Sequence, residues 1–143
     1  MSQRQYTYDN NLALKDAGLV AASAAAQVGG AAKIVDLGAG RVEGAVVIDV
    51  SAIETDTGDE KYELELQLSN DAAFAAGNVV AEVVKLGDSS TTGSSADSGT
   101  GRREMPFTNE VAGTIYRYAR MYTRIAGTIA TGINYTAFIG LFC

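Results

Sequence analysis

One stretch of the chain alternates between apolar and polar residues with a period of two. In Lys61–Ser69, KYELELQLS, the polar residues are glutamate and glutamine, and the apolar ones are Tyr62, Leu64, Leu66 and Leu68. Successive side chains of a β-strand point to opposite faces of its sheet, so these four share one face. A helix would distribute the glutamates around its circumference. The pattern therefore predicts a strand with one apolar face and one face in water, as antiparallel sheets commonly have.

Further strands are predicted where β-branched and aromatic residues gather between turn residues. They are Ala32–Leu37, Gly44–Val50, Val79–Leu86, Tyr116–Ile125 and Ile133–Phe142. Gly38–Gly40 suits a turn between the first two, and the last two are expected to form a pair across Gly127–Gly132. Glu104–Asn109 contains Pro106, the only proline. Because proline has no N–H to donate to a strand ladder, this segment is placed at a sheet edge or a strand end.

Two segments have no strand pattern. Leu12–Val28 is rich in alanine, and its intrinsic propensity favours a helix, although Gly18 interrupts it. The residues alone leave helix and strand equally open there. Gly87–Gly101 contains only Gly, Ser, Thr, Asp and Ala. Such a composition predicts a flexible loop between two strands.

With Leu19–Ala22 added, the chain has about eight strands at close spacing. This spacing is typical of a β-sandwich or a jelly roll. The length of 143 residues suits one domain with its own hydrophobic core. We therefore expect residues 1–143 to form a single all-β domain, a jelly-roll-like antiparallel β-sandwich.

The composition lacks the residues of common catalytic sites. The chain has no histidine, the commonest general base and metal ligand, and its only cysteine is Cys143. Neither a phosphate-binding glycine loop nor a nucleophile elbow is present. We therefore expect no enzyme activity and no cofactor. Glu54–Glu60 places four carboxylates in an expected hairpin loop. Their spacing is not that of an EF-hand, and a cation site and an ordinary acidic turn both stay open.

Charge is distributed unevenly along the chain. The net charge is −6, yet residues 102–143 carry five arginines against two glutamates, whereas residues 43–88 carry eleven acids and two lysines. An acidic surface repels phosphate, so we expect no nucleic-acid partner. The same asymmetry permits an acidic face of one chain to meet a basic strand of another. No apolar stretch is long enough to span a bilayer and no secretion signal is visible, so we expect cytoplasmic synthesis and no membrane partner.

The most distinctive segment is Ile115–Ile125, IYRYARMYTRI. Tyrosine and arginine are enriched in protein-interface hot spots, and aromatic residues among basic ones also occur on single-stranded nucleic-acid platforms. The structural alternative is cross-strand packing of the tyrosines, with the arginines reaching solvent. The candidate interface residues of this strand are Tyr116, Arg117, Tyr118, Arg120, Tyr122 and Arg124.

Short motifs follow one another along nearly the whole chain. In order they are Tyr6–Asn11 with Leu12 and Leu14, Asp16-Ala17, Ala21–Ala26, Ile34–Gly38, Glu63–Ser69 with Asn70-Asp71, Phe74, Tyr116–Met121 and a closing pair of strands separated by glycines. This order resembles the capsid cement proteins of tailed phages of the Bordetella-phage type, a small jelly-roll family. Each motif is short, and their order is what makes the resemblance specific.

The resemblance implies a non-enzymatic decoration protein on the virion exterior. Such a protein binds the outside of an assembled capsid, bridges major capsid protein subunits and associates with itself as a homodimer or homotrimer. The alanine-rich segment would be mostly extended, with Leu19–Ala22 in a sheet, and Gly87–Gly101 would be an insertion. Residues 1–11 would form a flexible N-terminal arm that orders on the shell through Tyr6 and Tyr8. The alternative is a carbohydrate- or receptor-binding jelly-roll module of a phage tail or virion, which the absence of tryptophan disfavours.

Overall fold

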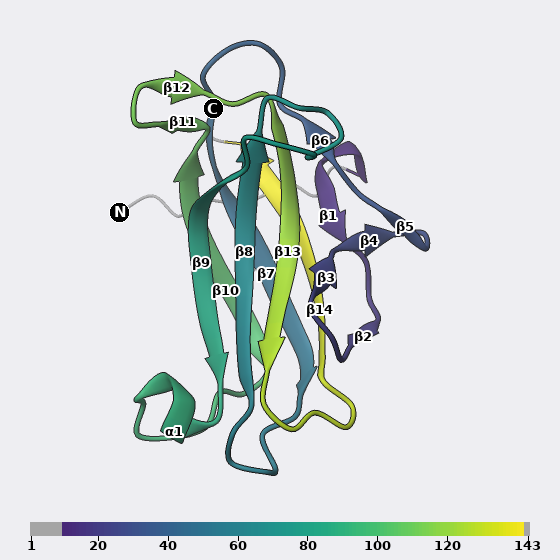
Figure 1. The fold of residues 1–143 in the computed structure, drawn as a ribbon, viewed down its shortest axis with the longest axis vertical. Coiled ribbons are helices and arrows are strands. Elements are labelled where there is room, and N and C mark those ends of the chain that lie inside the picture. The colour runs from purple at the N-terminus through teal and green to yellow at the C-terminus, as the bar shows by residue number, and fades with distance from the viewer. Residues whose placement is uncertain (1–9, 142–143) are drawn as a thin grey trace, which may run out of the picture.

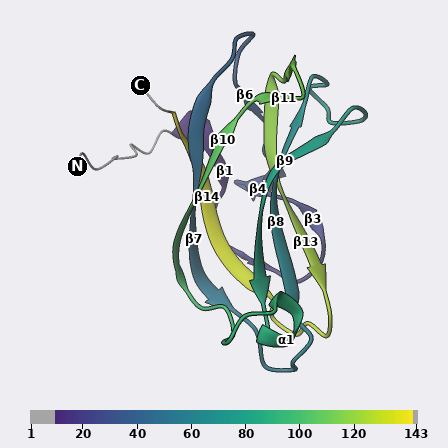
Figure 2. The ribbon, with the colours of Figure 1, turned by 90° about the vertical axis from the view of Figure 1, so that its left-hand side faces the viewer.

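Two antiparallel β-sheets pack face to face in this protein (Figures 1 and 2). The structure, a computed structural model, describes residues 10–141. Within them the chain is almost entirely β, with one short 3₁₀ turn, η1 (Asn10–Leu12), and one turn of helix, α1 (Ser89–Thr92). The prediction of an all-β sandwich is therefore confirmed. The N-terminal arm and its Tyr6 and Tyr8 lie outside the described residues.

The two sheets draw their strands from the whole chain. The first sheet has the order β1 (Ala13–Lys15), β14 (Ile133–Leu141), β7 (Glu43–Ile53), β10 (Gly101–Thr108), with β2 (Leu19–Val20) also pairing with β14. The second has the order β3 (Ala24–Ala25), β13 (Tyr118–Ala126), β8 (Lys61–Ser69), β9 (Val79–Gly87), with β6 (Val35–Asp36) also pairing with β13. Two small hairpins complete the fold, β4 (Gln27–Val28) with β5 (Ala31–Ala32) and β11 (Glu110–Val111) with β12 (Thr114–Ile115).

In each sheet, four strands follow one another in hydrogen-bonded order, as given above. Most connections between these eight strands pass from one sheet to the other. Numbered in chain order, these eight strands read 1-8-3-6 in the first sheet and 2-7-4-5 in the second. The expected pairing of the last two strands is therefore wrong, because β13 and β14 lie in different sheets. The acidic loop Glu54–Glu60 is likewise a crossover between β7 and β8 rather than a hairpin. Each of these strands buries its apolar face against the opposite sheet, and sequence spacing does not distinguish such a crossover from a hairpin.

The hydrophobic core lies between the sheets. The four alternating apolar residues of β8 are all completely buried there, as the alternation predicts. They face Val46 and Ile48 of β7 and Ile139 of β14 within one continuous cluster. Polar contacts are included as well: the hydroxyls of Thr123 and Tyr135 lie 2.6 Å apart, and the Tyr62 hydroxyl donates to the Glu54 carbonyl oxygen at 2.8 Å. Burial raises the pKa of Tyr135 to about 12, which keeps its phenol neutral inside the core.

The alanine-rich segment is extended rather than helical. It forms β1, β2, β3 and β4 in turn, crossing from the first sheet to the second between β2 and β3. This agrees with the resemblance and not with helix propensity. The segment predicted as one strand, Ala32–Leu37, is divided between β5 and β6.

The segment Gly87–Gly101 has more local structure than its composition predicts. Asp88 caps α1 by accepting a hydrogen bond from the Ser90 backbone N–H at 2.9 Å. Thr91 Oγ1 donates to the Glu60 carbonyl at 2.7 Å, which ties this turn to the start of β8. This ordered turn lies within the segment that the sequence predicts as a flexible loop between two strands. Small polar residues bury little surface, but their side chains cap and tether the backbone. Pro106 lies in β10, which is an edge strand as predicted.

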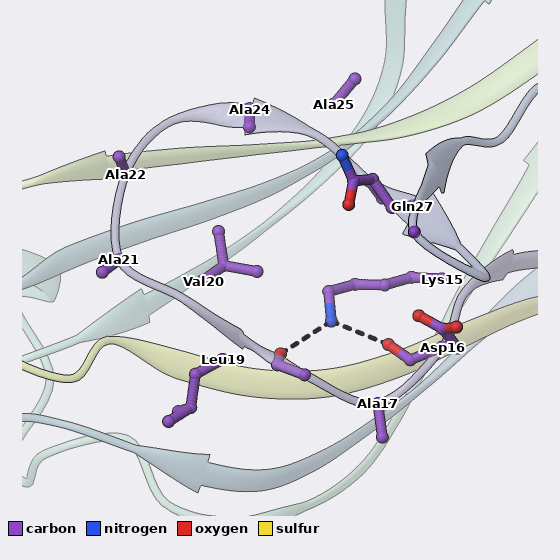
Figure 3. A pocket seen from close by; sticks show the side chains of 13 residues that line it. Lys15, Asp16, Ala17, Leu19, Val20, Ala21, Ala22, Ala24, Ala25 and Gln27 are labelled. Atoms are coloured by element: carbon purple, nitrogen blue, oxygen red, sulfur yellow. Dashed lines mark hydrogen bonds between the residues drawn. The ribbon is translucent and has the colours of Figure 1, made fainter.

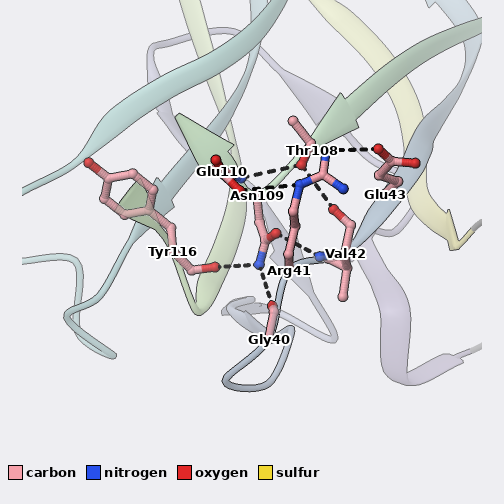
Figure 4. Close-up of polar contacts among 8 residues, drawn as sticks. All are labelled: Gly40, Arg41, Val42, Glu43, Thr108, Asn109, Glu110 and Tyr116. Carbon is pink, nitrogen blue, oxygen red and sulfur yellow. Dashed lines mark hydrogen bonds and ion pairs between the residues drawn. The ribbon is translucent and has the colours of Figure 1, made fainter. Parts of the chain in front are cut away.

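A buried asparagine joins three segments at one end of the sandwich (Figure 4). Asn109 is completely buried between β10 and β11. Its Oδ1 accepts from the Val42 backbone N–H at 2.8 Å. Its Nδ2 donates to the carbonyl oxygens of Gly40, at 3.0 Å, and Tyr116, at 2.9 Å. This side chain therefore fixes where the chain enters β7 and where it approaches β13.

Candidate interaction surface

The outer face of the second sheet presents the tyrosines and arginines of β13. Tyr118, Arg120, Tyr122 and Arg124 alternate along the strand with residues that face the core. Their neighbours across the sheet are the polar residues of β8, and beyond these lies β9 (Figure 1). The strand therefore brings together four of the six candidate residues that it was expected to carry.

A chain of hydrogen bonds runs across this face. Arg124 donates from Nε and Nη2 to the carboxylate of Glu65, at 3.0 and 3.3 Å. Gln67 Nε2 donates to Glu65 Oε1 at 3.1 Å, and Arg120 Nε donates to Gln67 Oε1 at 2.8 Å. The Arg124 guanidinium lowers the pKa of Glu65, which is only 6% exposed. The face of β8 that alternation assigns to water is thus covered by arginines from β13.

Aromatic rings lie against the guanidinium groups of Arg120 and Arg124. The guanidinium carbon of Arg120 lies 4.5 Å from the centre of the Phe74 ring and 5.6 Å from that of Tyr122. The guanidinium carbon of Arg124 lies 5.1 Å from the centre of the Tyr122 ring. Tyr122 therefore lies between two cations that its ring attracts. The contacts of Tyr122 are with arginines of its own strand, and Phe74 lies in the turn after β8, so they differ from the cross-strand packing of tyrosines that the sequence left open as a structural alternative.

The two remaining candidates lie before β13 begins. Arg117 forms a two-pronged ion pair with Asp36 of β6, both bonds at 2.9 Å, and the pair is exposed. Its hydrogen bonds lower the pKa of Asp36 to about 2. Tyr116 packs against the core, and its backbone N–H donates to the Asn109 carbonyl oxygen at 2.8 Å. Tyr116 is therefore an anchor of the fold and not part of the outer face.

Two valines that sequence reasoning missed extend the surface onto β9. Val80 is 48% exposed and Val83 is 37% exposed, and they lie opposite Gln67 and Glu65 respectively. Residues three apart on a regular strand point to opposite faces, but a β-bulge between Leu66 and Gln67 shifts the register. Both valines consequently reach the outer face. We call the set Tyr118, Arg120, Tyr122, Arg124, Val80 and Val83 the Tyr–Arg surface.

The carboxylates of the acidic crossover are used within the fold. Glu54 accepts backbone N–H bonds from Thr131 and Ala130, which lower its pKa. Asp59 accepts from the Thr57 hydroxyl and from the Thr128 backbone and hydroxyl, which lowers its pKa as well. These bonds tie the crossover to the loop after β13. Within the described part of the chain, no three acidic, cysteine or histidine side chains are grouped to hold a metal ion.

A cavity of about 480 Å³ lies inside the loop of chain that carries β2, β3 and β4 (Figure 3). Lys15 points into it, and its buried ammonium donates to the carbonyl oxygens of Asp16, Gly18 and Tyr135 at 2.8–3.0 Å. Burial lowers the pKa of this lysine. All three N–H bonds of the ammonium have an acceptor, so Lys15 joins the start of this loop to β14. Alanine methyl groups and backbone form most of the remaining wall.

No protein-family model matches this chain, and no curated protein matches it either. Among residues 10–141, no helix is long and apolar enough to cross a membrane.

Proposed function

We propose that this protein is a non-enzymatic capsid cement protein that binds the outer surface of an assembled capsid through the Tyr–Arg surface. The observation that carries the proposal is the composition of that exposed face. It combines tyrosine, arginine and exposed valine on one rigid sheet, with Glu65 and Gln67 buried beneath them. Tyrosine and arginine are the residue types that dominate binding energy at protein interfaces. The capsid, as the particular partner, is suggested by the sequence resemblance.

The strand order supports a jelly roll as the finer description of the fold. An eight-stranded jelly roll is formed by two Greek keys folded over one another. Its two sheets contain strands 1, 8, 3 and 6 and strands 2, 7, 4 and 5, and the same order is present here. The alanine-rich segment supplies strands 1 and 2 of this order, because β1 pairs with β14 and β3 pairs with β13.

The surface favours a protein partner over a nucleic acid. Glu63 and Glu65 lie among the arginines of this face, and Arg124 is already paired with Glu65. Because these carboxylates already neutralise Arg124 and Lys61, the face offers little unpaired positive charge to a phosphate backbone, which weakens its binding. A protein interface of ordinary size buries about 800 Å² on each partner, which one face of a domain of this length can offer. The partners we propose are the major capsid protein and further copies of this chain, as a homodimer or homotrimer on the virion exterior. Repetition of weak contacts across a lattice would supply the stability.

Mixing the purified protein with assembled capsids that lack it tests this function. We expect co-sedimentation and a shell that resists heat better than the undecorated one. Val83→Asp places an unpaired charge on the Tyr–Arg surface and should weaken binding at least about tenfold. Ser51→Asp is the matched control, because Ser51 is exposed on the other sheet. Absence of co-sedimentation by the wild-type protein, or equal losses for the two variants, would contradict the proposal.

A further inference from the structure

Arg120 stands apart from the other arginines of residues 10–141 because neither a side-chain carboxylate nor a backbone carbonyl oxygen of these residues accepts a hydrogen bond from it. Arg41, Arg102, Arg117 and Arg124 each form an ion pair within 3.3 Å. Arg103 has no carboxylate either, but it donates to the backbone carbonyl oxygens of Gly99 and Gly101. Within these residues Arg120 has a single hydrogen-bond acceptor, the side-chain oxygen of Gln67.

The charge of Arg120 is partly removed from water. The side chain is half-buried, and this burial lowers the pKa of its guanidinium. A partly desolvated cation without an anion is unfavourable, because neither water nor a counter-charge fully replaces the lost hydration. Its position is nevertheless fixed by the Phe74 and Tyr122 rings and by Gln67. Gln67 is itself held by Glu65, so the guanidinium is oriented before any partner arrives.

Phe74 is held as firmly as the arginine that it supports. It is 5% exposed and has a positive φ of 54°, which is uncommon for a residue with a side chain. Its backbone N–H donates to the Asp71 carbonyl oxygen at 3.0 Å, and its own carbonyl oxygen accepts from Asn78 Nδ2 at 3.0 Å. The Asp71 carboxylate accepts from two further backbone N–H groups of the same turn. The fold thus maintains a strained turn that places this ring beneath Arg120.

The outer edge of the guanidinium is available to a ligand. Among the described residues, only the N–H bond on Nε has an acceptor, and no buried side-chain nitrogen there lacks a partner. The two terminal nitrogens are therefore not fully buried and keep donors for a ligand. Two parallel N–H bonds of a guanidinium match the two oxygens of a carboxylate.

We propose that Arg120 is the docking point for an aspartate or glutamate side chain of the partner protein. The carboxylate accepts one hydrogen bond from each terminal nitrogen, and its methylene groups pack beside Tyr122 and the exposed Val80. Val80 lies opposite Gln67, on the same row of the sheet as Arg120. This inference rests on the proposed function only because it uses the same surface. It specifies which chemical group of the partner binds at the centre of the Tyr–Arg surface.

Side-chain NMR of the arginine Nε–Hε groups in the full chain tests the inference without a partner. The probes are sodium acetate and, separately, sodium chloride at equal ionic strength. We expect acetate to shift the Arg120 signal saturably, with half-saturation in the millimolar range, and chloride to leave it unchanged. Arg102, already paired with Asp49, is the internal control and should not respond. An Arg120 signal that responds no more than that of Arg102 overturns the inference. A stronger response to inorganic phosphate than to acetate overturns the choice of a carboxylate.

Capsid binding by matched lysine variants separates this inference from the proposed function. Arg120→Lys keeps the charge but loses the planar pair of donors, so we expect at least about tenfold weaker binding to undecorated shells. Arg102→Lys should bind like the wild type. If the wild type binds shells and Arg120→Lys binds equally well, the docking point is wrong while the proposed function stands. If the wild type does not bind shells but acetate saturates Arg120, the proposed function fails and the carboxylate site remains.

Discussion

Replacing Asn109 by alanine should destabilise the protein more than most single substitutions. The variant loses three hydrogen bonds of 2.8–3.0 Å from a completely buried side chain. Each bond contributes about 1 kcal/mol net, and a buried group left without a partner costs more. We therefore expect the free energy of unfolding to fall by about 3 kcal/mol. For a domain of this length, this corresponds to a decrease in Tm of roughly 10 °C.

Urea and thermal unfolding followed by far-UV circular dichroism measure this effect. Asn78→Ala is the matched control, because Asn78 is exposed and donates one hydrogen bond, to the Phe74 carbonyl oxygen. We expect that control to lose about 1 kcal/mol at most, because it gives up one hydrogen bond of an exposed side chain. Asn109→Asp keeps an acceptor for the Val42 N–H but directs a carboxylate at two carbonyl oxygens. Its loss of unfolding free energy relative to the wild type should be smaller at acidic pH, where a protonated carboxyl donates one hydrogen bond. Equal stability of Asn109→Ala and Asn78→Ala would refute the reasoning.

Two further outcomes concern the crossovers between the sheets. Glu54 and Asp59 have pKa values lowered by hydrogen bonds, so they stabilise the fold above their ordinary pKa and lose this contribution as the pH falls through the folded values. The urea midpoint should not change with pH above about pH 5 and should decrease below about pH 4. The decrease should be shallower in Glu54→Gln. A midpoint that does not depend on pH would contradict this. Gly132→Ala should cost about 2 kcal/mol or more in the same assay, because Gly132 has a φ of 89° and a Cβ there would overlap the Val20 carbonyl oxygen. Gly99→Ala, in open space at an ordinary φ, should be close to neutral.

The sequence predicts the strands of this fold better than their partners. Alternation predicts both ends of β8 at the residues where the structure has them, because one face of this strand is entirely apolar. It does not reveal that β13 and β14 belong to different sheets, since both hairpins and crossovers join strands of this kind. Composition predicts a flexible loop at Gly87–Gly101 because it reports how much surface a segment can bury. It says little about hydrogen bonds from small polar side chains, which form the turn α1 within that loop.

The candidate surface is predictable only in part, for physical reasons of the same type. Alternation along β13 places Tyr118 and Tyr122 on one face, and the structure has them there. Tyr116 would share that face on a continuous strand, but the chain is held by Asn109 at this point and β13 starts two residues later. Val83 reaches the surface through a bulge that no local pattern in β9 indicates.

In the folded protein, the uneven charge of the chain contributes to binding in a different way from the one that the sequence indicates. The arginines of the basic C-terminal part do not form an exposed basic patch, because Arg117 and Arg124 are neutralised by Asp36 and Glu65 of the same chain. A surface of free arginines would attract its partner over long range and lose affinity steeply with salt. Arg120 instead contributes a partly desolvated contact, which mobile ions screen less than an exposed charge.

Binding to shells should therefore depend only weakly on ionic strength. Between 0.1 and 1 M salt the screening length falls from about 10 Å to about 3 Å, and we expect less than about tenfold loss of affinity over that range. Co-sedimentation at increasing sodium chloride, with Arg120→Lys beside the wild type, measures this dependence. A loss of several orders of magnitude in the wild type would mean that unpaired surface charge carries the interaction, and the central role of one desolvated arginine would then be wrong.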